Sequence, residues 1–102
     1  LYHAYGLALV RSKQLPLAVM ALSRAAELQA DDARYTYVYA IALDANGETG
    51  KAIEVLERYH ERGQTSIEIL SALASYTRKA GDAAKADQYD QQLTALQRKQ
   101  PN

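Results

Sequence analysis

The sequence contains no cysteine, no tryptophan and no phenylalanine. Without cysteine, the chain cannot form a disulfide bond, a thiolate nucleophile or a cysteine-based zinc or haem attachment. Its 12 basic and 12 acidic residues cancel. This neutrality argues against nucleic-acid binding, because a phosphate backbone requires a basic face. No uninterrupted apolar run approaches the roughly 20 residues that cross a bilayer, so membrane insertion is not expected.

The sequence does contain enough apolar material for one small domain, because 48% of its 102 residues are hydrophobic. Its aromatic residues are eight tyrosines, and a tyrosine can pack in a core while its hydroxyl stays near water. That property suits a thin domain with few fully buried positions. Because Leu1 already lies inside a helical apolar pattern, we expect the chain to be a piece of a longer protein.

Six segments show apolar residues at helical spacing and are separated by short turns. They are residues 1–13, 17–30, 33–46, 51–62, 67–80 and 83–99. In the first segment Tyr2, Tyr5 and Leu9 should face inward, and in the second the inward stripe should reach Leu28. Six helices joined by short turns leave no room for a sheet. The fold class should therefore be all-α, with residues 1–102 in a single domain.

The segment 33–46 contains a run of strand-favouring residues from Tyr35 to Tyr39. We nevertheless predict a helix here, because alanines and Leu43 continue the segment without a break. A helix that is apolar on most sides is expected where it lies between other helices. Its stripe of Tyr35, Tyr39 and Leu43 should belong to the core.

Polar side chains that can cap a helix stand before four of the segments. Asp32, Thr49 and Asp82 should each accept a hydrogen bond from the first turn of the helix that follows. Thr65 and Glu68 have the spacing of a capping box.

The helices form an internal repeat with a period of 34 residues. Three sets of residues have this spacing: Ala18, Ala52 and Ala86; Gly6, Ala40 and Ala74; and Lys13, Gly47 and Gly81. The first two sets are small because antiparallel helices that cross closely, at about 8–10 Å between axes, need small residues at the crossing. A helical pair cannot bury its apolar stripe alone, so the pairs must stack.

This pattern resembles the tetratricopeptide repeat, with units at residues 1–32, 33–66 and 67–100. The first helix of each unit carries the large–small pair of that family at Tyr5-Gly6, Tyr39-Ala40 and Leu73-Ala74. The proline that the family has near the end of a unit is missing, and Ala30 and Gln64 stand in its place. The resemblance implies a right-handed α-solenoid of six antiparallel helices in three helix–turn–helix units. It also implies a protein–protein interaction scaffold and argues against an enzyme.

In this family the first helix of each unit lines a concave groove that holds a peptide or helix of a partner protein. The residues carried over to that groove are His3, Leu7, Val10, Arg11, Arg34, Tyr37, Ile41, Asp44, Glu68, Ser71, Ser75 and Arg78. Tyr37 and Ile41 are candidate anchors for such a partner. The alternative is that both side chains only pack against neighbouring helices.

A second resemblance is to the terminal repeats of large bacterial repeat proteins, some of which also carry multihaem cytochrome c domains. It rests on the strings at residues 34–57 and 70–82. It implies an alternative role, in which the repeats dock within a larger enzyme or cytochrome assembly. Asp90 stands where the other units have Leu22 and Leu56, so the sixth helix should be a polar terminal cap. The apolar start of the chain should pack against preceding repeats.

No pattern of catalytic or cofactor-binding residues emerges, so no cofactor, metal or catalytic site is expected. Residues 45–52 are only faintly similar to a phosphate-binding loop, because Ala45 and Ala52 replace its first glycine and its magnesium-binding hydroxyl. His3 and His60 fall in different units without a partner at ligand spacing. A third interpretation, an RNA-binding helical repeat, is disfavoured by the neutral charge and the repeat length.

Overall fold

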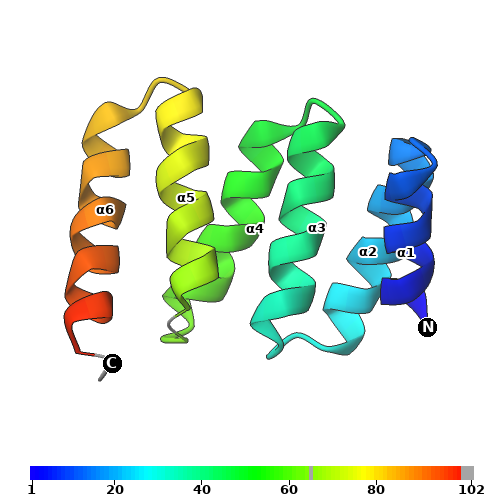
Figure 1. The fold of residues 1–102 in the computed structure, drawn as a ribbon, viewed down its shortest axis with the longest axis horizontal. Coiled ribbons are helices and arrows are strands. Elements are labelled where there is room, and N and C mark those ends of the chain that lie inside the picture. Colours follow the sequence, from blue (N-terminus) through cyan, green and yellow to red (C-terminus); the bar gives the residue numbers. More distant parts are fainter. Residues whose placement is uncertain (65, 100–102) are drawn as a thin grey trace.

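The computed structural model describes residues 1–64 and 66–99, which form six α-helices and no strand. The helices are α1 (Tyr2–Arg11), α2 (Leu15–Leu28), α3 (Ala33–Ala45), α4 (Thr49–Glu61), α5 (Ile67–Lys79) and α6 (Ala83–Arg98). Consecutive helices run in opposite directions and the three pairs follow one another in a row from the N-terminus to the C-terminus (Figure 1). The fold is an all-α solenoid of three helix–turn–helix units.

The helix predicted over the strand-like tyrosine run is present as α3. It packs against α2 and α5 as well as against its partner α4, so apolar residues on several of its sides can be buried. Tyr39 and Leu43 are buried, as predicted. The prediction is wrong for Tyr35, which is only half-buried. Its ring stacks on the His3 ring of α1, with ring centroids 4.2 Å apart.

The turn within each unit requires a left-handed backbone at the same repeat position. Gly47 and Gly81 have φ values of 82° and 90°, and Lys13, which replaces glycine in the first unit, has a φ of 61°. Glycine adopts this conformation without steric cost, whereas a residue with a Cβ does not. The three turns therefore share one geometry, although only two of them have the residue that suits it.

Two of the predicted caps are confirmed. The Asp32 carboxylate accepts a hydrogen bond of 2.9 Å from the backbone N–H of Arg34, and that of Asp82 accepts one of 3.1 Å from Lys85. The prediction for Thr49 is wrong, because this residue already lies inside α4 and its hydroxyl donates to Asp44.

The cap that starts α5 is Ser66, whose side-chain oxygen accepts from the backbone N–H of Ile69. The predicted cap Thr65 and the predicted unit end at residue 100 lie outside the described residues.

Small residues allow the helices of each pair to approach closely. Ala18, Ala52 and Ala86 are completely buried, and so is Ala40. In the first unit the equivalent residue is Gly6, and a Cβ added there would lie 2.5 Å from Cγ of the buried Leu22. The crossing of α1 and α2 therefore has no space for a methyl group unless Leu22 moves.

The inward stripes predicted for the first two helices are partly wrong. Leu9 is buried, but Tyr2, Tyr5 and Leu28 are exposed. The reason is positional, since Tyr2 and Tyr5 lie on the side of the first unit that no other described helix covers. None of the described helices combines the length and the apolar character needed to cross a bilayer.

Candidate functional site

Contacts between successive units connect α1, α3 and α5 on one side of the solenoid, which we call the first-helix face. His3 of α1 stacks on Tyr35 of α3. The Arg34 guanidinium of α3 donates to the Glu68 carboxylate of α5 at 3.1 Å. Both partners of this ion pair are about half exposed, so the pair aligns the two helices more than it stabilises them.

The centre of the first-helix face is an apolar area bordered by a second ion pair. Ile41 is 36% exposed, and Tyr37 is half-buried against the core. At its edge, Lys79 of α5 donates to the Asp44 carboxylate at 2.7 Å. Tyr76 of α5 lies close to both Tyr37 and Asp44.

Two pKa shifts describe the electrostatics of this area. Burial, reinforced by the charge of Asp44, raises the pKa of the Tyr76 hydroxyl to about 12, so it stays protonated at neutral pH. Burial alone would raise the pKa of Asp44, but the hydrogen bonds from Lys79 and Thr49 lower it below its usual value. The carboxylate therefore stays ionised and holds Lys79 at the border of the apolar area.

The other residues predicted for the groove differ in how far they are exposed. Leu7 and Val10 are half-buried against the core, while Arg11, Ser71 and Ser75 are exposed. Arg78 contacts a different helix, because its guanidinium donates to Asp87 at 3.0 Å and to Asp90 at 2.9 Å, both on α6.

Asp90 is thus paired with Arg78 and half exposed. The two acidic residues, Asp87 and Asp90, therefore form a polar side of α6 that is ion-paired to α5.

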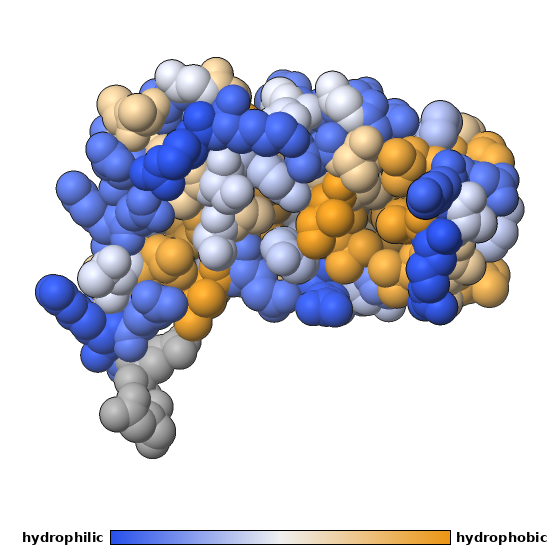
Figure 2. Space-filling model, turned by 45° about the horizontal axis from the view of Figure 1, so that its top comes forward, coloured by the Kyte–Doolittle hydropathy of each residue, from blue (hydrophilic) through white to orange (hydrophobic). Residues whose placement is uncertain are grey.

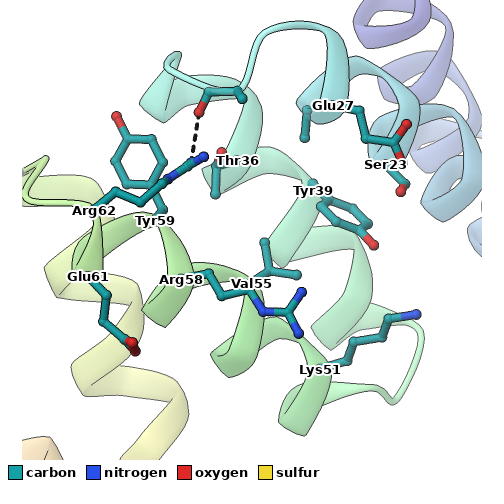
Figure 3. A pocket seen from close by; sticks show the side chains of 12 residues that line it. Ser23, Glu27, Thr36, Tyr39, Lys51, Val55, Arg58, Tyr59, Glu61 and Arg62 are labelled. Atoms are coloured by element: carbon teal, nitrogen blue, oxygen red, sulfur yellow. Dashed lines mark hydrogen bonds between the residues drawn. The ribbon is translucent and has the colours of Figure 1, made fainter.

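Sequence reasoning missed a cavity of about 630 Å³ on the other side of the solenoid, between α2 and α4. We call it the outer groove. Its apolar lining includes Ala26, Tyr39 and Val55, and its charged lining includes Lys51 and Arg58. At one end Arg62 donates to the backbone oxygen of Ala30 at 3.0 Å and lies over the ring of Tyr59, with Lys51 at the opposite end (Figure 3).

An apolar surface lies at the end of the solenoid formed by α1 and α2, which we call the end face. Its exposed residues are Tyr2, Tyr5, Leu17 and Met20, which line a cavity of about 360 Å³ together with Ala21 and Arg24. On the face drawn in Figure 2, more hydrophobic surface lies over the N-terminal half of the chain than over the C-terminal half. The repeat explains this difference, because Thr36 and Tyr39, at the positions of Tyr2 and Tyr5 in the second unit, are covered by the preceding unit.

Among the described residues, no group of three or more histidine, aspartate or glutamate side chains is arranged to hold a metal ion. The His60 ring is engaged with Gln92 at 2.8 Å and the His3 ring with Tyr35. Three helix–turn–helix units that stack in a row define a helical-repeat protein.

Comparison with known proteins identifies the repeat. A family model described as tetratricopeptide repeat matches residues 33–76, which contain α3, α4 and most of α5. This segment therefore belongs to the tetratricopeptide-repeat family, and the first and third units share its helical register. Tetratricopeptide repeats act in general as protein-interaction scaffolds and are typically not enzymes.

The fold is also found in a solved structure, that of MamA AMB-1. The two chains superimpose with a TM-score of 0.80 at 20% sequence identity. The match covers 98% of this chain and 55% of that one, so the chain spans about half the length of that protein. At this identity the likeness establishes the fold alone. No curated protein sequence matches the chain.

Proposed function

We propose that the protein holds a peptide or helix of a partner protein on its first-helix face, with Tyr37 and Ile41 as the anchor site. The observation that carries the proposal is the exposure of Ile41 in an area bordered by the Asp44–Lys79 ion pair. An apolar centre with a charged border is the arrangement by which protein interfaces combine affinity with orientation. The Arg34–Glu68 pair on the same face would contact the flanks of the bound segment.

A selection from a displayed library of random peptides tests this site without knowledge of the natural partner. Peptides enriched on the wild-type chain should lose most of their binding to Ile41→Ser. They should keep their binding to Leu28→Ser, which also replaces an exposed aliphatic side chain by serine, on α2 and outside this face. Equal retention of the enriched peptides by both variants contradicts the proposal, provided that both variants melt at the wild-type temperature.

A second function is favoured by the end face, where Tyr2 and Tyr5 are exposed although their repeat equivalents are buried. Tyr2 and Tyr5 are 42% and 57% exposed, whereas Thr36 and Tyr39 are 4% and 8% exposed. This face would dock on preceding repeats of the same protein or within a larger enzyme or cytochrome assembly. The polar sixth helix, with Asp87 and Asp90 paired to Arg78, does not offer a matching apolar surface.

A comparison between this chain and a longer chain that carries preceding repeats tests the docking function. If the end face is covered in the longer chain, Tyr5→Lys should lower its melting temperature more than Leu28→Lys does. In the 102-residue chain the two variants should behave alike, since both leucine and tyrosine are exposed there. Equal effects of both variants in both proteins exclude docking through this face.

A further inference from the structure

The outer groove lies between the second helices of two successive units, and the same junction occurs a second time in the chain. The first junction joins α2 to α4 and the second joins α4 to α6. A shift of 34 residues places Ser23, Lys51 and Val55 of the first junction on Glu57, Lys85 and Tyr89 of the second. The two junctions can therefore be compared position by position.

At the second junction the space between the helices is filled by side chains. The Tyr89 hydroxyl donates to the Glu57 carboxylate at 2.6 Å, and Lys85 pairs with the same carboxylate at 2.7 Å. His60 packs edge-on against the Tyr89 ring, with centroids 6.1 Å apart. An aromatic ring, a carboxylate and a lysine thus close this junction.

At the first junction only the lysine is kept. Val55 replaces the tyrosine, Ser23 replaces the glutamate, and Ala26 replaces the histidine. The missing ring and carboxylate leave the outer groove, whose volume is about 630 Å³. The floor that remains is apolar and includes Tyr39 and Val55.

The charges around the outer groove favour an acidic occupant. Lys51 makes no ion pair with any described residue, unlike its equivalent Lys85. Two acidic residues, Glu27 and Glu61, also line the groove. The Glu27 carboxylate is already paired with Arg24 at 3.2 Å. Arg58 is only loosely paired, with its guanidinium 4.0 Å from the Glu54 carboxylate.

We propose that the outer groove binds a segment of a partner protein that carries an aromatic side chain next to a carboxylate. The aromatic ring would lie over Val55 and Tyr39, and the carboxylate would pair with Lys51. The occupant would supply the two groups that Tyr89 and Glu57 supply at the second junction. This site is separate from the one on the first-helix face, and the two are tested independently.

The binding test uses the capped peptide Gly-Glu-Tyr-Glu-Gly as the probe and amide shifts in NMR spectra as the readout. The peptide should shift the amides of Ser23, Lys51 and Val55, and Lys51→Glu should weaken binding by about fivefold to tenfold. Lys99→Glu makes the same charge change outside the groove and should bind like wild type. Replacement of the tyrosine by alanine, or of both glutamates by glutamine, in the peptide should also weaken binding.

Three results overturn the proposal. The first is that the peptide shifts only the amides of Tyr37 and Ile41. The second is that Lys51→Glu and Lys99→Glu bind the peptide equally. The third is that the wild-type chain binds the free amino acid derivative N-acetyltyrosine as tightly as it binds the peptide. The first of these results would leave the function of the first-helix face intact. Equal affinity for N-acetyltyrosine would mean that the groove takes a small aromatic acid and not a protein segment.

A second experiment asks whether the groove is open because it lacks the tyrosine and the glutamate of the second junction. The double variant Ser23→Glu/Val55→Tyr reproduces at the first junction the residues of the second. It should bind the peptide at least about tenfold more weakly than wild type, because the introduced ring and carboxylate occupy the site. It should also melt at a higher temperature than either single variant. A double variant that melts below both and still binds the peptide refutes the comparison of the two junctions.

Discussion

The Glu57 carboxylate of α4 accepts hydrogen bonds from both Tyr89 and Lys85 of α6, at 2.6 Å and 2.7 Å. It thereby joins the second and third units through one acidic group whose side chain is only 19% exposed. Burial alone would raise the pKa of Glu57, but the bonds from Lys85 and Tyr89 lower it below the usual value of 4.5. Burial, together with the hydrogen bond to Glu57, raises the pKa of the Tyr89 hydroxyl.

The stability of the solenoid should therefore fall in acid. Because the pKa of Glu57 is lower in the folded chain than in the unfolded one, its contribution is fully present above about pH 4.5. That contribution is lost as the pH falls through the lowered pKa. Glu57→Gln should lower the free energy of unfolding at pH 7 by about 1–2 kcal/mol, and it should flatten the acid dependence of stability.

Urea unfolding at several pH values between neutral and acid measures this effect. Glu54→Gln is the matched control, because Glu54 is exposed and lies 4.0 Å from Arg58. Its stability curve should follow that of wild type. Parallel curves for Glu57→Gln and wild type down to acid would show that Glu57 does not carry the pH dependence.

The left-handed turn at Lys13 offers a simple route to a more stable chain. A non-glycine residue in this conformation costs about 1–2 kcal/mol, whereas glycine in the unfolded chain costs about 0.5–1 kcal/mol of extra entropy. Lys13→Gly should therefore raise the free energy of unfolding by up to about 1.5 kcal/mol, the largest difference between these two terms. The gain follows from the φ of 61° at Lys13.

Chemical denaturation of Lys13→Gly and Lys99→Gly distinguishes the turn from a general effect of glycine. Lys99 has an ordinary right-handed φ of −81°, so glycine there should bring no gain. A loss of stability in Lys13→Gly would mean that the lysine side chain contributes more than its backbone costs.

The repeat could be predicted from the sequence because it depends on backbone geometry and on the size of a few residues. Ala18, Ala52 and Ala86 mark the same helix crossing in each unit, and any larger residue there would separate the helices. The α3 helix follows from the same logic, because the strand preference of its tyrosines is weaker than the packing on several of its sides. These constraints are local and recur every 34 residues.

The surfaces were harder to predict, because they depend on which side chains are absent. The outer groove exists because Val55 and Ser23 are smaller than their repeat equivalents Tyr89 and Glu57. The sequence contained this signal, but only a comparison of second helices between units reveals it. Periodicity alone does not reveal the exposure of Tyr2 and Tyr5, since it specifies an inward stripe without specifying whether another unit covers it.

Even one methyl group added at the crossing of α1 and α2 should destabilise the chain. A Cβ at Gly6 would lie 2.5 Å from Cγ of Leu22, which is completely buried and has little freedom to move. Alanine favours a helix over glycine by about 0.5–1 kcal/mol, but a clash in a packed core costs about 1–3 kcal/mol. Gly6→Ala should therefore destabilise the chain despite its better helix propensity.

Gly50 provides the matched control for Gly6, because it also lies in a helix and a Cβ there would meet no atom within 4 Å. Gly50→Ala should raise the melting temperature while Gly6→Ala lowers it. A rise in both variants would show that Leu22 can shift without cost.

The second helix crossing provides the strongest test of the 34-residue register. Ala52 is completely buried between α3 and α4, so Ala52→Leu should overpack the crossing and lower the free energy of unfolding by about 1–3 kcal/mol or more. Ala84→Leu makes the same change at an exposed position of α6, where the effect should stay within about 0.5 kcal/mol. Thermal unfolding followed by circular dichroism compares the two variants. An unchanged melting temperature for Ala52→Leu would contradict the close approach of helices from which the three-unit repeat was inferred.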